Sequence, residues 1–150
     1  MSIKPLHILQ ADDDIDDILL FKYALKEIPI VSSLTTVRDG EELMAYLSEN
    51  AARLPDVLFL DLSMPRKTGF ECLAEIQADE NLKQLPVIMF STSFPRDTFY
   101  ERGMINTLMK LGAQNYIRKP GDFTQLVEVI HQALIRLAEE TGIVLPKKDL

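Results

Sequence analysis

The sequence has one cysteine, Cys72, no tryptophan and no long apolar run. A single cysteine excludes an internal disulfide, which is typical of a protein from a reducing compartment. No stretch approaches the roughly 20 consecutive apolar residues that a transmembrane helix needs. The segment before Asp12 also lacks the apolar core of a signal peptide. We therefore expect a cytoplasmic protein with no membrane partner.

Basic residues are also scarce. Lysine and arginine number 16 against 23 acidic residues, which gives a net charge of -7. A negative surface repels phosphates, so we expect no nucleic-acid partner. Apolar residues, in contrast, are plentiful: they make up 47% of the 150 residues. That content is enough for one domain with a full hydrophobic core.

Short apolar runs alternate along the chain with segments of helical periodicity. The runs predict strands at residues 6–9, 33–37, 57–60, 87–90 and 115–117. The periodic segments predict helices at residues 15–25, 41–48, 70–77, 96–111 and 123–137, the last one capped by Asp122. This alternation favours parallel βαβ units. We predict an α/β fold, a doubly wound (βα)5 three-layer sandwich whose parallel five-stranded sheet has the order 2-1-3-4-5.

Polar residues stand where four of the predicted strands end. Asp12, Asp13 and Asp14 follow the first strand, and Asp61, Ser91 and Lys119 follow the third, fourth and fifth. Functional groups of such sheets gather beyond the carboxyl ends of the strands. In the assumed order the first and third strands are neighbours, about 4.8 Å apart. Asp12 and Asp13 should therefore face Asp61.

The residue types at these strand ends suit phosphoryl chemistry. Carboxylates so close together repel one another and raise each other's pKa, which a divalent cation relieves. Mg²⁺ prefers such oxygen ligands. An aspartate can act as a nucleophile and form an aspartyl phosphate. The Ser91 hydroxyl can donate to a phosphoryl oxygen, and the long Lys119 side chain can bring a positive charge to it across two strand spacings, roughly 10 Å.

Taken together, the motifs resemble those of the response-regulator receiver family, which has a chemotaxis-type, flavodoxin-like fold. The resemblance covers nearly the whole chain, in five segments that follow the family's order and spacing: Ile8–Asp14, Arg38–Leu43, Asp56–Pro65, Pro86–Ser91 and Gly112–Pro120. The segment between Ser91 and Gly112 looks longer than is usual for the family, by about one or two helical turns. It is therefore a candidate for a partner-specific surface.

The resemblance implies a role for each of these residues. Phosphorylation falls on Asp61, with Lys119 and Ser91 assisting, and Ser91 and Tyr116 act as switch residues. The metal ligands are Asp12, Asp13, Asp61 and the backbone carbonyl of Ser63. The cofactor is Mg²⁺, for which Mn²⁺ can substitute. The peptide bond between Lys119 and Pro120 is expected to be cis.

The resemblance also implies the working context of the protein. We expect a receiver domain at residues 1–141 and a loose C-terminal tail at residues 142–150. The chain would be a phosphoprotein of a two-component phosphorelay, a monomer or weak homodimer without an attached output domain. Its partners would be a histidine kinase or histidine phosphotransfer protein and a downstream protein target. It would not be an enzyme beyond phosphorylating and dephosphorylating itself.

Other interpretations of the same residues stay open at this stage. The aspartates at 12–14 could have no role other than capping a helix, and we expect Asp14 to be such a cap. Tyr116 could be a packing residue without a switch role. The acidic run faintly resembles the two-aspartate motif of haloacid-dehalogenase-type phosphatases, but Asp16 stands where that motif has threonine. A third possibility is an interaction module that has kept the fold and lost the chemistry.

Overall fold

The computed structural model describes residues 4–92 and 98–149. Five strands and five helices alternate within these residues: β1 (Leu6–Ala11), α1 (Ile15–Glu27), β2 (Ser32–Val37), α2 (Gly40–Glu49), β3 (Val57–Leu60), α3 (Gly69–Ala78), β4 (Val87–Ser91), α4 (Thr98–Leu111), β5 (Asn115–Arg118) and α5 (Phe123–Thr141). All strand pairs are parallel. The sheet order is β2-β1-β3-β4-β5, which confirms the predicted fold class.

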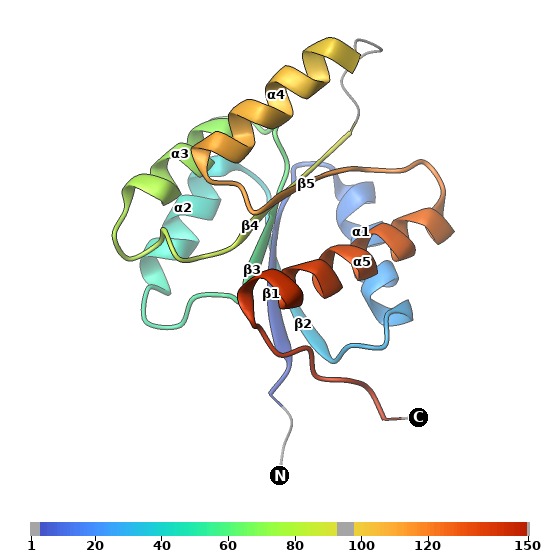
Figure 1. Cartoon of the computed structure of the whole chain (residues 1–150). Coiled ribbons are helices and arrows are strands. Elements are labelled where there is room, and N and C mark those ends of the chain that lie inside the picture. Colours follow the sequence, from blue (N-terminus) through green and yellow to red (C-terminus); the bar gives the residue numbers. More distant parts are fainter. Residues whose placement is uncertain (1–3, 93–97, 150) are drawn as a thin grey trace.

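The sheet is the middle of three layers. Helices α1 and α5 cover one face, and α2, α3 and α4 cover the other (Figure 1). The central strands β3 and β4 are buried at every position. Side chains of a strand point alternately to the two faces, so each central strand contributes to both cores.

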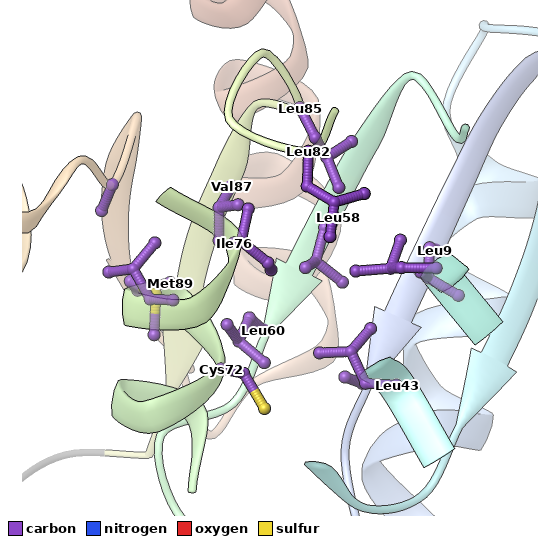
Figure 2. Close-up of a cluster of buried hydrophobic side chains, with 14 of the residues drawn as sticks. Leu9, Leu43, Leu58, Leu60, Cys72, Ile76, Leu82, Leu85, Val87 and Met89 are labelled. Atoms are coloured by element: carbon purple, nitrogen blue, oxygen red, sulfur yellow. The ribbon is translucent and has the colours of Figure 1, made fainter. Parts of the chain in front are cut away.

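The core under α2, α3 and α4 is built from aliphatic and sulfur-containing side chains. Figure 2 shows Leu58 and Leu60 of β3 pointing toward Leu43 of α2 and toward Cys72 and Ile76 of α3. All five side chains are fully buried. Cys72 therefore fills core space, and burial raises the pKa of its thiol to about 12, which keeps it protonated and unreactive.

The core under α1 and α5 contains an aromatic cluster. Phe21 of α1 packs edge to face against Phe59 of β3 and Phe90 of β4, with ring centroids 5.0 and 5.7 Å away. Phe59 and Phe90 also contact each other, at 5.8 Å. Edge-to-face pairs add to the free energy gained by burial. The cluster therefore anchors the middle of α1 to the two central strands.

Capping residues set where the helices begin. Asp14 accepts a hydrogen bond from the Asp17 amide at 3.1 Å, which confirms its expected role at the start of α1. Asp122 caps α5 as predicted. Thr68 and Glu71 form a capping box at the start of α3. These caps satisfy amide groups that would otherwise lack partners at the helix starts.

The expectation of a loose tail is wrong for residues 143–148. Val31 donates its amide to the Pro146 carbonyl at 2.7 Å, and Ile30 and Lys147 form an antiparallel bridge. Ile143 and Leu145 pack against the core under α1 and α5. The segment is ordered because it adds apolar burial and backbone hydrogen bonds beside the start of β2, the edge strand of the sheet.

The expected cis bond is also wrong, since no peptide bond among the described residues is cis. The trans isomer of an X–Pro bond is intrinsically favoured by about 0.5–1 kcal/mol. With this isomer the Lys119 amide still donates to the Ser91 carbonyl at 2.8 Å. The lysine is therefore held at the end of β5 without a cis bond. Of the helix predicted at 96–111, residues 96 and 97 lie outside the described residues.

Candidate functional site

The strand ladders hold the predicted site residues at one edge of the sheet. The Asp12 amide donates to the Val37 carbonyl at 3.1 Å, and the Asp61 amide donates to the Ala11 carbonyl at 3.0 Å. Each ladder thus continues one residue beyond its strand. Because all strands are parallel, these residues lie at the same carboxyl edge as Ser91.

Three carboxylates converge at this edge. Asp12, Asp13 and Asp61 each place one carboxylate oxygen within 4.8 Å of the others. Asp12 and Asp61 are buried, at 1% and 7% exposure, whereas Asp13 is exposed. Hard oxygen ligands at the solvent end of a buried cluster suit Mg²⁺, which usually binds one or two carboxylates and keeps several waters. The predicted metal ligands therefore fit a small divalent cation.

Burial is the main influence on the Asp61 carboxyl. It raises the pKa of Asp61 to about 6; the Lys119 charge and a hydrogen bond from Ser91 oppose this rise, and the Asp12 and Asp13 charges add to it. The expected repulsion between carboxylates contributes, but desolvation contributes more, because Asp61 directly follows a strand that is buried on both faces. At neutral pH the group is mostly ionised yet poorly compensated.

The Lys119 side chain reaches this cluster as predicted, but among the described residues it forms no direct hydrogen bond with Asp61. Its ammonium donates to Asp12 at 2.5 Å and to Asp17 at 3.0 Å. Burial lowers the pKa of Lys119, but the hydrogen bond to Asp12 and the nearby charge of Asp61 outweigh it, so the net shift is upward. The lysine therefore remains charged and neutralises several carboxylates at once.

The predicted switch residues lie on β4 and β5. Ser91 ends β4 and is buried, and its hydroxyl acts on the Asp61 carboxyl to lower the pKa of that group. Tyr116 of β5 is partly buried against the core under α2, α3 and α4. Its hydroxyl is buried without a hydrogen-bond partner among the described residues. Burial raises the pKa of that hydroxyl, and the Glu101 charge adds to the rise.

The loop after β3 is pressed against the site by a glycine. The Gly69 amide donates to the Leu62 carbonyl at 2.9 Å. A Cβ atom at Gly69 would clash with the Asp61 carbonyl oxygen and with the backbone of Leu62. Only glycine permits this close approach. Ser63 lies exposed in this loop, two residues after Asp61, and the role of its carbonyl stays a prediction.

One site residue, Asp17, and one buried polar residue close to the site, Gln10, were missed in the sequence. Asp17 lies in the first turn of α1, and helical spacing could have revealed it, since Phe21 follows four residues later on the face that packs on the sheet. Gln10 of β1 precedes Asp12 by two residues, so the two side chains point to the same face of the sheet. Gln10 is 1% exposed. Neither polar atom of its amide has a partner in the described part of the chain. A glutamine inside an apolar strand carries no signal of this kind.

Among the described residues, no helix is long and apolar enough to span a membrane. Comparison with known proteins adds the family context. Residues 8–131 match the family model of the response regulator receiver domain. The response regulator Rcp1 of Synechocystis is 39% identical over 101 residues, which covers 64% of this chain and 68% of that protein.

Solved structures agree with this match. The phosphorylated cyanobacterial phytochrome response regulator RcpA is 33% identical and superposes with a TM-score of 0.77, covering 96% of this chain and all of that one. The Mn²⁺-bound form of Rcp1 is 28% identical with a TM-score of 0.75, covering 95% and 99%. On the family match and the shared fold, the chain belongs to the response regulator receiver domains.

Proposed function

We propose that this protein is a phosphorylation switch in which Asp61 accepts a phosphoryl group. The observation that carries the proposal is the convergence of Asp12, Asp13 and Asp61 within 4.8 Å, with the Lys119 ammonium bound to Asp12. A buried, mostly ionised aspartate beside a cation and a hydroxyl is equipped for nucleophilic attack on phosphorus. We assign the described chain, including residues 143–148, to one receiver domain.

The transfer step takes a phosphoryl group from a donor. An Asp61 carboxylate oxygen forms a bond to phosphorus, and the bond between phosphorus and the donor's nitrogen or oxygen breaks, with the electron pair leaving on the donor. Asp12, Asp13, Asp61 and the Ser63 carbonyl would hold a divalent cation, which would neutralise charge on the phosphoryl oxygens. Mg²⁺ is the expected ion, and the Mn²⁺-bound form of Rcp1 supports Mn²⁺ as a substitute.

Lys119 and Ser91 then stabilise the product. The ammonium has three N–H groups, of which two are used by Asp12 and Asp17. A third is left for a phosphoryl oxygen. The buried Ser91 hydroxyl is close enough to Asp61 to influence its pKa and can donate to the phosphoryl group. Both groups therefore stand ready for the product before it forms.

Tyr116 links this chemistry to the surface. Its hydroxyl lacks a partner among the described residues, so its buried position is only weakly held. When Ser91 turns toward a phosphoryl group, the aromatic ring can follow into the vacated space. The signal is thus a shift between two populations of one domain. This shift changes the surface of β5 that a downstream protein would recognise.

The phosphodonor partner would be a histidine kinase or a histidine phosphotransfer protein in the cytoplasm. Helix α1 supports this proposal because it begins beside the acidic cluster and carries exposed apolar side chains one turn apart. Ile15, Leu19 and Tyr23 are 59%, 45% and 47% exposed. Such a stripe suits contact with an amphipathic helix of a partner.

The phosphoacceptor assignment is tested by incubating the protein with Mg²⁺ and acetyl phosphate. Intact-mass spectrometry should show one added phosphoryl group, which is lost in Asp61→Asn and retained in the control Asp16→Asn, a change at an exposed aspartate. Equal labelling of Asp61→Asn would refute the assignment. Sustained turnover of a phosphomonoester would instead favour a phosphatase.

The partner surface is tested separately by phosphotransfer from a panel of purified phosphorylated histidine kinases. Leu19→Glu should reduce transfer from the best donor at least tenfold, since a charge would enter an apolar contact. The same variant should accept phosphate from acetyl phosphate at the normal rate. Unchanged transfer from the kinase would place the partner elsewhere on the surface.

A further inference from the structure

Asp17 is a functional-site residue to which the family resemblance assigned no role. Its carboxylate accepts a hydrogen bond from the Lys119 ammonium at 3.0 Å, while Asp12 accepts one at 2.5 Å. The Lys119 side chain is 7% exposed and that of Asp17 is 29% exposed. The single buried ammonium is therefore shared between one residue of the acidic cluster and one residue of α1.

The helix aims Asp17 at the site. Residues four apart lie on the same helix face, and Asp17, Phe21 and Leu25 have this spacing. Phe21 and Leu25 are buried against the sheet, and the aromatic cluster anchors Phe21. Asp16, the preceding residue, is exposed in the same helical turn, whereas the ion pair with Lys119 is made by Asp17. The direction of the Asp17 side chain is thus set by the packing of α1.

The shared ammonium competes with a metal ion. Asp12 belongs to the three converging carboxylates, so an ammonium bound to it repels a divalent cation and occupies a ligand oxygen. Asp17 is not one of those three residues. It can therefore hold the ammonium without giving up a metal ligand, and its attraction draws the charge toward α1.

We propose that Asp17 is a positioning residue that shares the Lys119 ammonium with Asp12 and draws it toward α1, so that the divalent cation and the ammonium can occupy the site together. The proposal rests on the proposed function, since it concerns the same site. It accounts for an ion pair that the transfer chemistry alone does not require. Without Asp17, the ammonium is left with Asp12 and Asp61 and competes more strongly with the cation.

Mg²⁺ affinity measured by isothermal titration calorimetry on the unphosphorylated protein tests this role. Asp17→Asn should weaken binding about five- to tenfold, as expected for coupling between contacting charges. The control Asp16→Asn removes the same charge from the same helical turn and should change affinity less than about twofold. Asp17→Glu should restore affinity, because the longer carboxylate still reaches Lys119. Thermal unfolding of each variant checks that it is folded.

A double-mutant cycle separates positioning from simple charge. In a Lys119→Met background, Asp17→Asn should weaken Mg²⁺ binding no more than Asp16→Asn does. An equal effect of Asp17→Asn in both backgrounds would show that it acts through its own charge, which overturns the proposal. Equal effects of Asp17→Asn and Asp16→Asn in the presence of Lys119 would also overturn it.

The outcomes distinguish this inference from the proposed function. Retained labelling of Asp61→Asn by acetyl phosphate refutes the phosphoacceptor assignment and leaves the calorimetric cycle interpretable. Tight Mg²⁺ binding with no specific effect of Asp17→Asn refutes only the positioning role. A native protein that binds no Mg²⁺ overturns both.

Discussion

The two layers that cover the sheet are packed in different ways. Under α1 and α5, the rings of Phe21, Phe59 and Phe90 pack edge to face against one another. Lys119, which forms ion pairs with Asp12 and Asp17, lies over the Phe90 ring. Under α2, α3 and α4, the core is aliphatic, includes methionines, and has Tyr116 at its margin. Rigid rings suit a layer that fixes charges in place, whereas adaptable side chains suit a layer that changes shape.

Each layer also buries one polar group without a partner among the described residues. Gln10 lies on the side of α1 and α5, because it alternates with Leu9 and Ala11 of the other core. Tyr116 lies on the opposite side. Both groups sit close to the carboxyl edge, while the remaining core is apolar. Buried polar atoms without hydrogen-bond partners in the described part of the chain therefore lie near the site on both faces of the sheet.

The largest predicted effect concerns the aromatic cluster. Phe21→Ala should lower the free energy of unfolding by about 3–5 kcal/mol, since it removes a fully buried ring and leaves a cavity. Leu73→Ala in the opposite core should cost about 2–4 kcal/mol by the same mechanism. Urea unfolding followed by circular dichroism measures both. A smaller loss for Phe21→Ala than for Leu73→Ala would contradict the view that the aromatic layer is the more rigid.

The next effect concerns the loop that is pressed against Asp61. Gly69→Ala should lower the free energy of unfolding by about 2–3 kcal/mol, because the new Cβ meets backbone atoms that cannot yield. Gly103→Ala is the matched control, since its Cβ would meet no atom within 4 Å and it lies inside α4. It should stabilise by about 0.5–1 kcal/mol. Equal effects of the two changes would disprove the tight contact at Gly69.

Asp61 should make the free energy of unfolding of the metal-free protein depend on pH. Its pKa is about 6 in the folded protein against an ordinary 3.8, so the folded state holds the proton more tightly. Its contribution to the free energy of unfolding therefore falls as pH rises from about 4 to 6, and stays low above that. Asp61→Asn removes this penalty and should stabilise the protein at pH 7.5 by about 1–2 kcal/mol, or roughly 2–6 °C.

Thermal melts at pH 4.5 and 7.5 with chelator measure this difference. The gain from Asp61→Asn should be smaller at pH 4.5 and should shrink or reverse at pH 7.5 when Mg²⁺ is added, because the variant has lost a carboxylate ligand. The exposed control Asp16→Asn should show no comparable pH dependence. A gain from Asp61→Asn that is independent of pH would show that burial does not raise the Asp61 pKa.

The smallest effects concern the two buried polar groups without partners. Gln10→Leu should raise the free energy of unfolding by about 1 kcal/mol, and Tyr116→Phe by less, since each removes buried polar atoms that make no compensating hydrogen bond. Urea midpoints of the metal-free protein measure both changes. Destabilisation by Tyr116→Phe would reveal a hydrogen bond of its hydroxyl in solution and would weaken its assignment to a loosely held state.

Much of this arrangement was predictable from local patterns. The strand Val57–Leu60 has the same bounds in the prediction and in the structure. A short apolar run followed by a charged residue indicates a buried strand that ends before the charge. The prediction of a loose tail was wrong for residues 143–148, because their order depends on the segment before β2, an edge strand, lying beside them. The pairing of Asp17 was missed because its partner, Lys119, lies 102 residues away. Helical spacing places Asp17 on the buried face of α1 but does not identify that partner.

The order of strands and helices, the caps at Asp14 and Asp122, and the four polar positions at strand ends could be predicted from the amino-acid sequence, because they follow from hydrophobic periodicity and turn chemistry. How those polar groups are paired depends on the packed fold. Lys119 binds Asp12 and Asp17, and burial more than repulsion raises the pKa of Asp61. Pairing and desolvation depend on distances and exposure between distant segments, which exist only once the layers have packed.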